Sequence, residues 1–393
     1  MAKIAKIAEY FYLSKRLKGA MNRIVVSVIN DLVTDQRVNR MADTLGASGY
    51  DILLVGRRLP GRLPLPETTH RIRRFRMIIL RGPLFYAFFN MRLFLFLLFT
   101  KRPSMLLAND LDTLAANMLV STIRRIPLLY DSHEYFTEVP ELVHRPHIRR
   151  IWEFIESMTV PKLRAAMTVS PSIAKEYEKK YGVSFTVVRN VSHRRSVVKD
   201  PDFNDRYPAT YKLIYQGALN MGRGLELLIS SMKYISDTTL LIVGDGDIRD
   251  ALRKQVRTME LEHKVFFLGR VPPEVLHKIT CQCHLGISLE EDLGLNYRMA
   301  LPNKIFDYIQ ARIPVLCSNL PEMAALVQEH GIGAVCPDRT PEGLARQILS
   351  MLTDRQATMR WKKNLEAAAE VLCWENERHL LEGLVSKTIE GNE

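Results

Sequence analysis

Short, continuously apolar runs alternate with longer segments whose apolar residues recur at helical spacing from residue 23 onward. Runs that are apolar on both faces are typical of parallel strands covered by helices on both sides of a sheet. The first series of predicted strands covers residues 23–29, 51–55, 104–108, 127–130, 166–169 and 186–188. A second series covers residues 212–215, 240–243, 265–268, 285–288 and 315–317. The pattern predicts an α/β protein with two doubly wound, Rossmann-like domains.

The stretch between the two series, residues 192–210, is polar and contains proline, so we expect it to link the domains. The predicted organisation is a basic N-terminal extension, a first domain, a second domain and a C-terminal segment, covering residues 1–22, 23–198, 199–372 and 373–393. Ligands of doubly wound folds bind at the carboxyl ends of the strands. We therefore expect the functional site in a cleft between the two sheets.

Residues 84–99, LFYAFFNMRLFLFLLF, depart from this pattern because nearly all of them are apolar or aromatic. The segment is too short to span a bilayer, and Asn90 and Arg92 interrupt it. Basic residues flank it on both sides. Two interpretations stay open: a buried helix of the first domain, or an apolar face that makes peripheral membrane contact through residues 71–102.

The N-terminal extension has apolar residues at helical spacing (Ile4, Ile7, Ala8 and Phe11) among several lysines. It is interpreted as a membrane-surface helix, a disordered start, or a segment that precedes the true start at Met21. No signal peptide is expected, since the segment has no continuous apolar core.

The formal net charge of +12 is unevenly distributed. Residues 1–200 carry 33 Lys and Arg against 17 Asp and Glu, whereas the remainder carries 22 against 26. A basic first half favours an anionic lipid or an acidic acceptor as partner. Nucleic acid is not expected, because the sequence has no recognised nucleic-acid motif.

Five cysteines in 393 residues do not form a disulfide framework, and Cys281 and Cys283 lack the second pair that a zinc site needs. The expected location is the cytoplasm, with peripheral attachment to the inner membrane face.

The segment LPNKIFDY predicts an anion site in the second half. Pro302 suits the start of a helix, and Asn303 and Lys304 follow it, so free backbone N–H groups and a cation would face the same place. Asp307 lies one turn further, where its carboxylate suits the vicinal hydroxyls of a ribose. The alternative is an ordinary surface turn in which Lys304 and Asp307 form a solvated pair.

A glycine-rich loop follows the first strand of the second series. Gly217, Gly222 and Gly224 let the backbone approach a ligand closely, and Arg223 offers several donors to a diphosphate. The segment VGDGD, which ends the next strand, is interpreted as a tight turn that borders the site.

In the first half, the segment YDSHEYF ends a strand, so His133 is expected to face the cleft and to bind a sugar hydroxyl; a satisfied loop histidine is the alternative. The candidates for contact with an acceptor follow two other strands: Thr34, Asp35, Arg37, Asn109 and Asp110. One of Thr34 and Asp35 is expected to cap a helix. The sequence has no Ser-His-Asp set, metal triad or Walker loop.

Five motifs in order, DSHE, YQG…RG, GDG, FLGRV and LPNKIFDY, resemble retaining glycosyltransferase family 4, over about residues 22–385. The resemblance implies the GT-B fold, with a last helix near Trp374 that crosses back to the first domain. It also implies that Asp307 holds the ribose of a nucleotide and that His133 lies near the donor sugar. The remaining donor-binding positions that it implies are Arg223, Asn303 and Lys304 at the diphosphate, and Arg270 and Val271 at the nucleobase. Gly217, in the glycine-rich loop, is a further donor-binding candidate.

Two positions depart from the family pattern. Met299 stands where the family has a second acid, for which Glu290, Glu291 or Asp292 would substitute, and Ala218 stands where it has an arginine. Arg223 and Lys304 are therefore expected to carry more of the diphosphate charge.

The expected activity is transfer of a sugar from a nucleotide-diphosphate sugar to an acceptor hydroxyl with retention, without metal or cofactor, in bacterial polysaccharide or glycolipid assembly. Catalysis is assigned to His133, Arg223 and Lys304. The alternatives are an epimerase or phosphorylase of the same fold, and a non-catalytic nucleotide-sugar-binding protein. A dehydrogenase is not favoured, because no GxGxxG follows the first strand.

Overall fold

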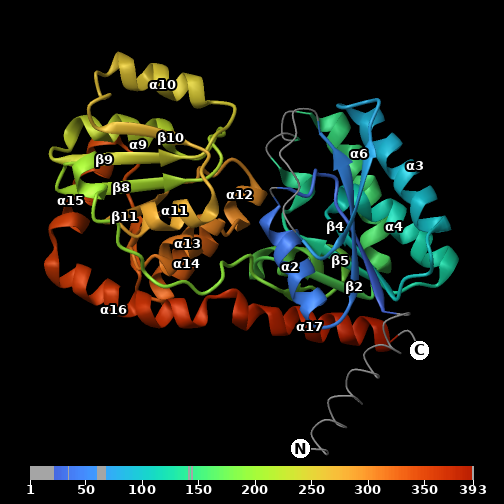
Figure 1. Ribbon diagram of the computed structural model, residues 1–393. Helices are drawn as coiled ribbons and strands as arrows, with labels where there is room; N and C mark the ends of the chain where they lie inside the picture. Colours follow the sequence, from blue (N-terminus) through green and yellow to red (C-terminus); the bar gives the residue numbers. More distant parts are fainter. Residues whose placement is uncertain (1–21, 34, 60–67, 140–141, 143–144, 392–393) are drawn as a thin grey trace, which may run out of the picture. The chain divides into compact units, whose positions relative to one another are not determined.

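The structure is a computed structural model, and it describes residues 22–33, 35–59, 68–139, 142 and 145–391 (Figure 1). The described chain divides into two compact units. The first unit consists of two segments, the chain up to Arg189 and the chain from Arg378 onward. The second unit runs from Asn190 to Glu377.

The first unit is built on a parallel sheet of seven strands in the order β3-β2-β1-β4-β5-β6-β7. The strands are β1 (Arg23–Ser27), β2 (Asp51–Arg58), β3 (Arg71–Arg76), β4 (Met105–Asn109), β5 (Leu128–Ser132), β6 (Ala165–Thr168) and β7 (Thr186–Val187). Its helices are α2 (Gln36–Ala47), α3 (Pro83–Phe99), α4 (Leu111–Arg124), α6 (Pro146–Thr159), α7 (Pro171–Tyr181) and the short η1 (Phe136–Glu138) and η2 (Val160–Lys162). The central strands β1 and β4 are almost completely buried, which explains their unbroken apolar runs.

The second unit has a parallel sheet of six strands in the order β10-β9-β8-β11-β12-β13. The strands are β8 (Tyr211–Gln216), β9 (Thr238–Val243), β10 (Val265–Gly269), β11 (Leu285–Ser288), β12 (Val315–Ser318) and β13 (Gly333–Cys336). The helices of this unit are α8 (Phe203–Arg206), α9 (Leu225–Ser231), η3 (Met232–Tyr234), α10 (Arg249–Thr258), α11 (Pro273–Thr280), α12 (Leu295–Met299), α13 (Asn303–Gln310), α14 (Pro321–Glu329), α15 (Pro341–Thr353) and α16 (Arg355–Val371).

Both units have the predicted α/β architecture with a doubly wound sheet. Each sheet has one place where the strand order reverses. This place lies between β1 and β4 in the first sheet and between β8 and β11 in the second. At such a switch point the loops from neighbouring strands leave in opposite directions, which opens a crevice at their carboxyl ends. The fold therefore marks the loops after β1, β4, β8 and β11 as the places for ligands.

The two units divide nine residues earlier than the predicted boundary at 198/199. The reason is that the chain after Arg189 is bound within the second unit. Ser192 accepts a hydrogen bond at its carbonyl from the Trp374 amide (2.9 Å), and the Arg195 amide donates to Gln310 Oε1 (3.0 Å). The last helix, α17 (Trp374–Glu390), belongs to the second unit up to Glu377 and to the first from Arg378.

Helix α3 shows why residues 84–99 admitted two interpretations. One side of the helix, with Phe85, Phe89, Leu93 and Leu97, is buried in the first unit. The opposite side is also apolar, yet Leu84 and Phe99 are 70% and 81% exposed. Among the described residues, no helix is both long enough and apolar enough to cross a membrane. Of the predicted basic extension, residues 1–22, only Asn22 is among the described residues.

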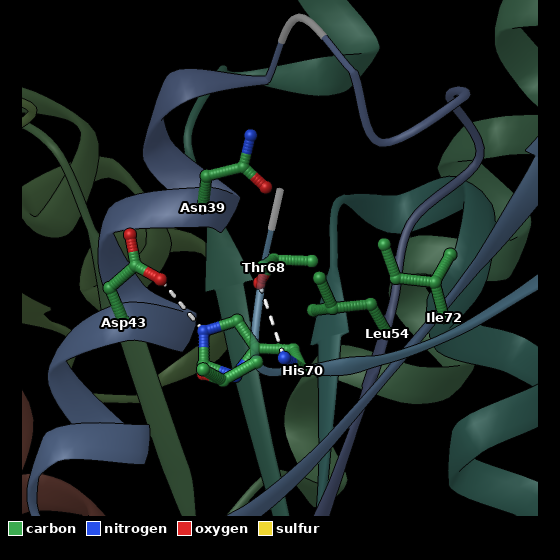
Figure 2. A pocket seen from close by; sticks show the side chains of 7 residues that line it. Asn39, Asp43, Leu54, Thr68, His70 and Ile72 are labelled. Atoms are coloured by element: carbon green, nitrogen blue, oxygen red, sulfur yellow. Dashed lines mark hydrogen bonds and ion pairs between the residues drawn. The ribbon is translucent and has the colours of Figure 1, made fainter. Parts of the chain in front are cut away.

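A hollow of about 530 Å³ lies beside α2 in the first unit (Figure 2). Asn39 and Asp43 of α2 line it together with Leu54, Thr68, Thr69, His70 and Ile72. His70 Nε2 lies 2.7 Å from Asp43 Oδ1 at its wall. No residue predicted for the functional site lines this hollow, so it is separate from the candidate site.

Candidate functional site

Two cations and one carboxylate meet at the switch point of the second sheet. Lys304 lies in the first turn of α13, and its Nζ is 2.6 Å from Glu290 Oε1. Arg223, from the loop after β8, places NH1 3.5 Å from the same oxygen. Both Glu290 and Lys304 are buried, whereas the Arg223 side chain is 28% exposed. With two cations sharing one carboxylate, the cluster carries a net positive charge.

The packing around the cluster fixes the two cations in place. Lys304 Nζ lies 4.2 Å from the centre of the Tyr215 ring, and the Arg223 guanidinium lies 5.1 Å from that of Tyr297. Ser288 Oγ donates to Glu290 Oε2 at 2.7 Å. Cations over aromatic faces gain electrostatic stabilisation without losing their charge.

The protonation states of the cluster follow from burial and charge. Burial raises the pKa of Glu290, but Lys304 and Arg223 outweigh it, so this pKa lies below its ordinary value. Burial lowers the pKa of Lys304, although the Glu290 carboxylate opposes that shift. A ligand with negative charge would favour the cationic form of Lys304 further.

The loops that surround the cluster depend on two glycines. Gly217 follows β8 with a φ of +136°, and Gly224 has a φ of +69°. A Cβ on Gly224 would lie 2.1 Å from the carbonyl oxygen of Leu289, so the loops after β8 and β11 touch through their backbones. Only glycine allows that approach at this backbone conformation.

Asp307 of α13 contacts the end of β8 and the chain that precedes it, and not Lys304. Its Oδ2 accepts from Gln216 Nε2 at 2.7 Å, and its Oδ1 accepts from Ser192 Oγ. Lys304 instead points into the unit toward Glu290, so the alternative of a solvated Lys304–Asp307 pair is wrong. The helix start, the cations and Asp307 are nevertheless all brought to the end of β8.

The other residues predicted for the donor lie at neighbouring loops. Asn303 is exposed at the start of α13. Arg270 follows β10, is 70% exposed, and places Nε 3.8 Å from Asp245 Oδ2. Val271 comes next and is half-buried. The GDG turn of Asp245 packs on the loop after β8, since the Leu219 amide donates to the Asp245 carbonyl at 3.1 Å.

The acids expected to replace the residue missing at Met299 are all engaged in ion pairs. Glu290 binds the two cations, Asp292 Oδ2 lies 2.5 Å from Arg298 NH2, and Glu291 Oε1 lies 4.0 Å from Arg339 NH2. Sequence reasoning missed that Glu290 organises the cations. The signal that could have found it is its position two residues after the buried strand β11, at the switch point of the sheet.

In the first unit, His133 and Asp110 form an ion pair at the ends of β5 and β4. His133 Nε2 lies 2.9 Å from Asp110 Oδ2. Burial disfavours the charged imidazole, but Asp110, Asp131 and Asp35 outweigh it and raise the pKa of His133 to about 10. The imidazole is therefore a cation at neutral pH, which donates hydrogen bonds and cannot act as a base.

Several polar atoms around this pair have no hydrogen-bond partner among the described residues. They are His133 Nδ1 and one carboxyl or amide oxygen each of Asp110, Asp112 and Asn109. Asp110 also holds a φ of +59°, which is rare outside glycine. Burial and the nearby Asp110 raise the pKa of Asp112 well above its ordinary value. Such an arrangement suits a ligand with hydroxyl groups.

The remaining acceptor-side candidates support the fold of the first unit. Arg37 is buried and donates through Nε and NH2 to Asp131 (2.8 and 2.7 Å) and through NH1 to the Val188 carbonyl (2.9 Å). Asp35 caps α2 by accepting from the Val38 amide at 3.0 Å. Asn109 is buried and donates to the Ser27 carbonyl at 3.1 Å. Thr34 lies outside the described residues.

The chain matches two family models and proteins of known name. Residues 199–367 match Glycosyl transferases group 1, and residues 35–191 match Glycosyltransferase Family 4. The chain is 24% identical over 220 residues to the chitobiosyldiphosphodolichol beta-mannosyltransferase of Kluyveromyces lactis, covering 49% of this chain and 48% of that protein. The matches span only 35–48% of the length of the curated relatives.

Solved structures share the fold at low identity. Sucrose-phosphate synthase from Thermosynechococcus elongatus has a TM-score of 0.76 and 16% identity, over 94% of this chain and 100% of that one. HepE from Anabaena, in complex with UDP and glucose, has a TM-score of 0.69 and 14% identity, over 93% and 100%. With the two family models matching the two units in order, the chain belongs to the group 1 glycosyltransferases and has the GT-B fold.

Proposed function

We propose that this protein transfers a sugar from a nucleotide-diphosphate sugar to an acceptor hydroxyl, with retention of the anomeric configuration. The observation that carries the proposal is the pair of cations, Arg223 and Lys304, that share Glu290 at the switch point of the second sheet. One carboxylate does not neutralise two cations, so positive charge remains beside the start of α13. That charge suits the negative charge of a diphosphate.

The proposed reaction needs little covalent chemistry from the protein. The bond between the anomeric carbon and the donor phosphate oxygen breaks, and the acceptor oxygen bonds to the same face of the sugar. The departing phosphate accepts the hydroxyl proton. Arg223, Lys304 and the backbone N–H groups at the start of α13 stabilise the charge that develops on the diphosphate. Retention is supported by the family resemblance.

The other roles are assigned by chemistry. Asp307 accepts hydrogen bonds from the ribose, and Arg270 and Val271 flank the base. His133 is a cation and donates to an oxygen of the transferred sugar rather than removing a proton. The orphaned oxygens of Asp110 and Asp112 accept from hydroxyl groups. HepE was solved with UDP, which makes UDP-sugars the first donors to test.

We further propose that the acceptor belongs to polysaccharide or glycolipid assembly and that the protein works at the cytoplasmic face of the inner membrane. The name of the Kluyveromyces lactis relative contains a diphosphodolichol, which is a lipid-linked substrate. The basic first half and the exposed apolar side of α3 support peripheral contact through residues 71–102.

A two-stage experiment tests the proposed transfer. Thermal unfolding with a panel of UDP-, GDP- and ADP-sugars identifies the donor, because a bound ligand raises stability. NMR of the products formed with and without sugar acceptors then reads the reaction. A new glycosidic bond with the donor's anomeric configuration supports the proposal. Conversion of the donor without any acceptor would indicate an epimerase, and binding without turnover would indicate a non-catalytic protein.

A further inference from the structure

Exposed apolar side chains gather on three helices of the first unit. Of the twenty large apolar side chains that are exposed in the described chain, twelve lie between residues 78 and 158. Nine of them are on helices: Leu84, Met91, Leu95 and Phe99 on α3, Leu119 and Ile123 on α4, and Ile151, Phe154 and Met158 on α6. We call these nine residues the three-helix face.

The spacing along each helix puts these residues on its outer side. On α3 they recur at intervals of seven, four and four residues, opposite the buried stripe that contains Phe89 and Leu93. On α6 they recur at intervals of three and four, opposite the buried Trp152. A helix of a soluble protein normally carries polar residues on its outer side. The outward apolar stripes therefore indicate a surface that a binding partner covers.

The three helices form one continuous surface. Asn90 Nδ2 of α3 donates to the Asp112 carbonyl of α4 at 2.7 Å. Arg124 NH1, at the other end of α4, donates to the Leu97 carbonyl at 2.7 Å. The Tyr86 ring of α3 packs edge-on against Trp152 of α6, with ring centres 5.1 Å apart. Figure 1 shows α3, α4 and α6 gathered on one side of the sheet.

Positive charge borders this surface. Residues 71–109 contain eight Lys and Arg and no Asp or Glu. Four of these arginines lie on β3, which is the edge strand next to α3 in the chain, and Arg71, Arg73 and Arg76 are exposed. Lys101 and Arg102 are exposed at the opposite end of α3. The surface thus has an apolar centre and a basic edge.

We propose that the three-helix face is a docking surface for an anionic lipid bilayer, on which α3 lies in the plane of the headgroups. Apolar side chains that insert shallowly, with Lys and Arg beside them, are the features that hold interfacial helices on anionic membranes. A second copy of the chain fits less well, since a two-fold dimer would bring two such basic edges together. Such docking would be the membrane contact proposed above, and it does not depend on glycosyl transfer.

Vesicle flotation of the full chain tests this inference without any donor sugar. We expect binding to vesicles of phosphatidylcholine with phosphatidylglycerol, little binding to phosphatidylcholine alone, and weaker binding as salt rises. The triple variant Leu84→Gln/Leu95→Gln/Phe99→Gln should bind at least about tenfold less well. The matched control, Met359→Gln/Val371→Gln, changes exposed apolar residues of α16 in the second unit and should bind like the natural chain.

A second pair of variants separates this surface from the N-terminal extension. Arg73→Ser/Arg76→Ser should weaken binding, and Lys3→Ser/Lys6→Ser should weaken it less. Circular dichroism on each variant establishes that it folds. The proposal is overturned if the natural chain does not float with anionic vesicles, or if the folded triple variant floats equally well. It is also overturned if light scattering shows a dimer that the triple variant loses. The triple variant should still transfer sugar to a soluble acceptor. Loss of vesicle binding with transfer retained would show that this surface acts separately from the proposed transferase activity.

Discussion

Lys304 and Glu290 lie fourteen residues apart in the chain and form a buried ion pair, with Nζ 2.6 Å from Oε1. A buried pair of this kind is costly to desolvate and gives no assurance of stability. Arg223 approaches the same carboxylate, which therefore balances the charge of two cations only in part. The protein therefore holds two cations beside one carboxylate, at the place where we propose that the diphosphate binds.

The first prediction concerns Glu290→Gln. Removing the carboxylate leaves Lys304 buried without its counter-charge, so the free energy of unfolding should fall by about 3 kcal/mol. A nucleoside diphosphate should recover part of this loss, because its charge replaces that of Glu290. Urea denaturation with and without UDP measures both effects. Glu291→Gln, at a partly exposed carboxylate 4.0 Å from Arg339, is the control and should change stability little.

The second prediction concerns the two cations. Arg223→Met and Lys304→Met should each weaken binding of the nucleoside diphosphate by about 1.5–3 kcal/mol, which is the value of a hydrogen bond to a charged group. Isothermal titration measures the dissociation constants. Lys233→Met removes an exposed lysine of the same unit and should leave affinity unchanged. If Arg223→Met binds as tightly as the natural chain, Arg223 does not contact the diphosphate.

The third prediction concerns the Asp110–His133 pair. The pKa of His133 is raised from 6.5 to about 10 in the folded protein, so the protonated imidazole stabilises the fold. That contribution is complete below pH 6.5 and disappears as the pH rises through about 10. Asp110→Asn should return the pKa of His133 toward its ordinary value. It should therefore destabilise the protein at pH 6 and have a smaller effect above pH 10.

NMR titration of the histidine ring protons tests this pair directly. In the natural chain His133 should stay protonated at pH 8, whereas in Asp110→Asn it should titrate below that pH. His263→Gln changes an exposed histidine and should alter neither result. A His133 that titrates near pH 6.5 in the natural chain would contradict the proposed role as a cationic donor.

The fold was predictable where the apolar pattern was strong. The strands of both series were found, and β3 and β13 were missed for different reasons. Four of the six residues of β3 are arginine, because an edge strand needs few buried side chains. Strand β13 is only four residues long and starts with glycine, so its sequence, GAVC, has little strand character.

The site was predictable as a set of loops, but the contacts within it were not. Pro302 marked the helix start, and the helix follows from Asn303. The partner of Lys304 comes from another loop, and helical spacing cannot show such a contact. Lys304 and Asp307 are only three residues apart on α13, yet tertiary packing turns the lysine toward Glu290 and the aspartate toward Gln216. Local periodicity does not determine which of two nearby partners a charged side chain takes.

The last prediction concerns Asp307, which already accepts from Gln216 Nε2 at 2.7 Å and from Ser192 Oγ. Each carboxylate oxygen has a second lone pair, so the group can also accept from the two ribose hydroxyls. Asp307→Asn turns one of these acceptor oxygens into an N–H donor, which can no longer accept a hydrogen bond from a ribose hydroxyl. The natural chain should bind a nucleoside diphosphate more tightly than its 2′-deoxy counterpart, and Asp307→Asn should lose most of that preference. Comparing the two ligands in both proteins cancels any general loss of stability. The control, Asp245→Asn at the neighbouring turn, should keep the preference for the ribose form. If Asp307→Asn shows the same preference as the natural chain, another residue binds the ribose.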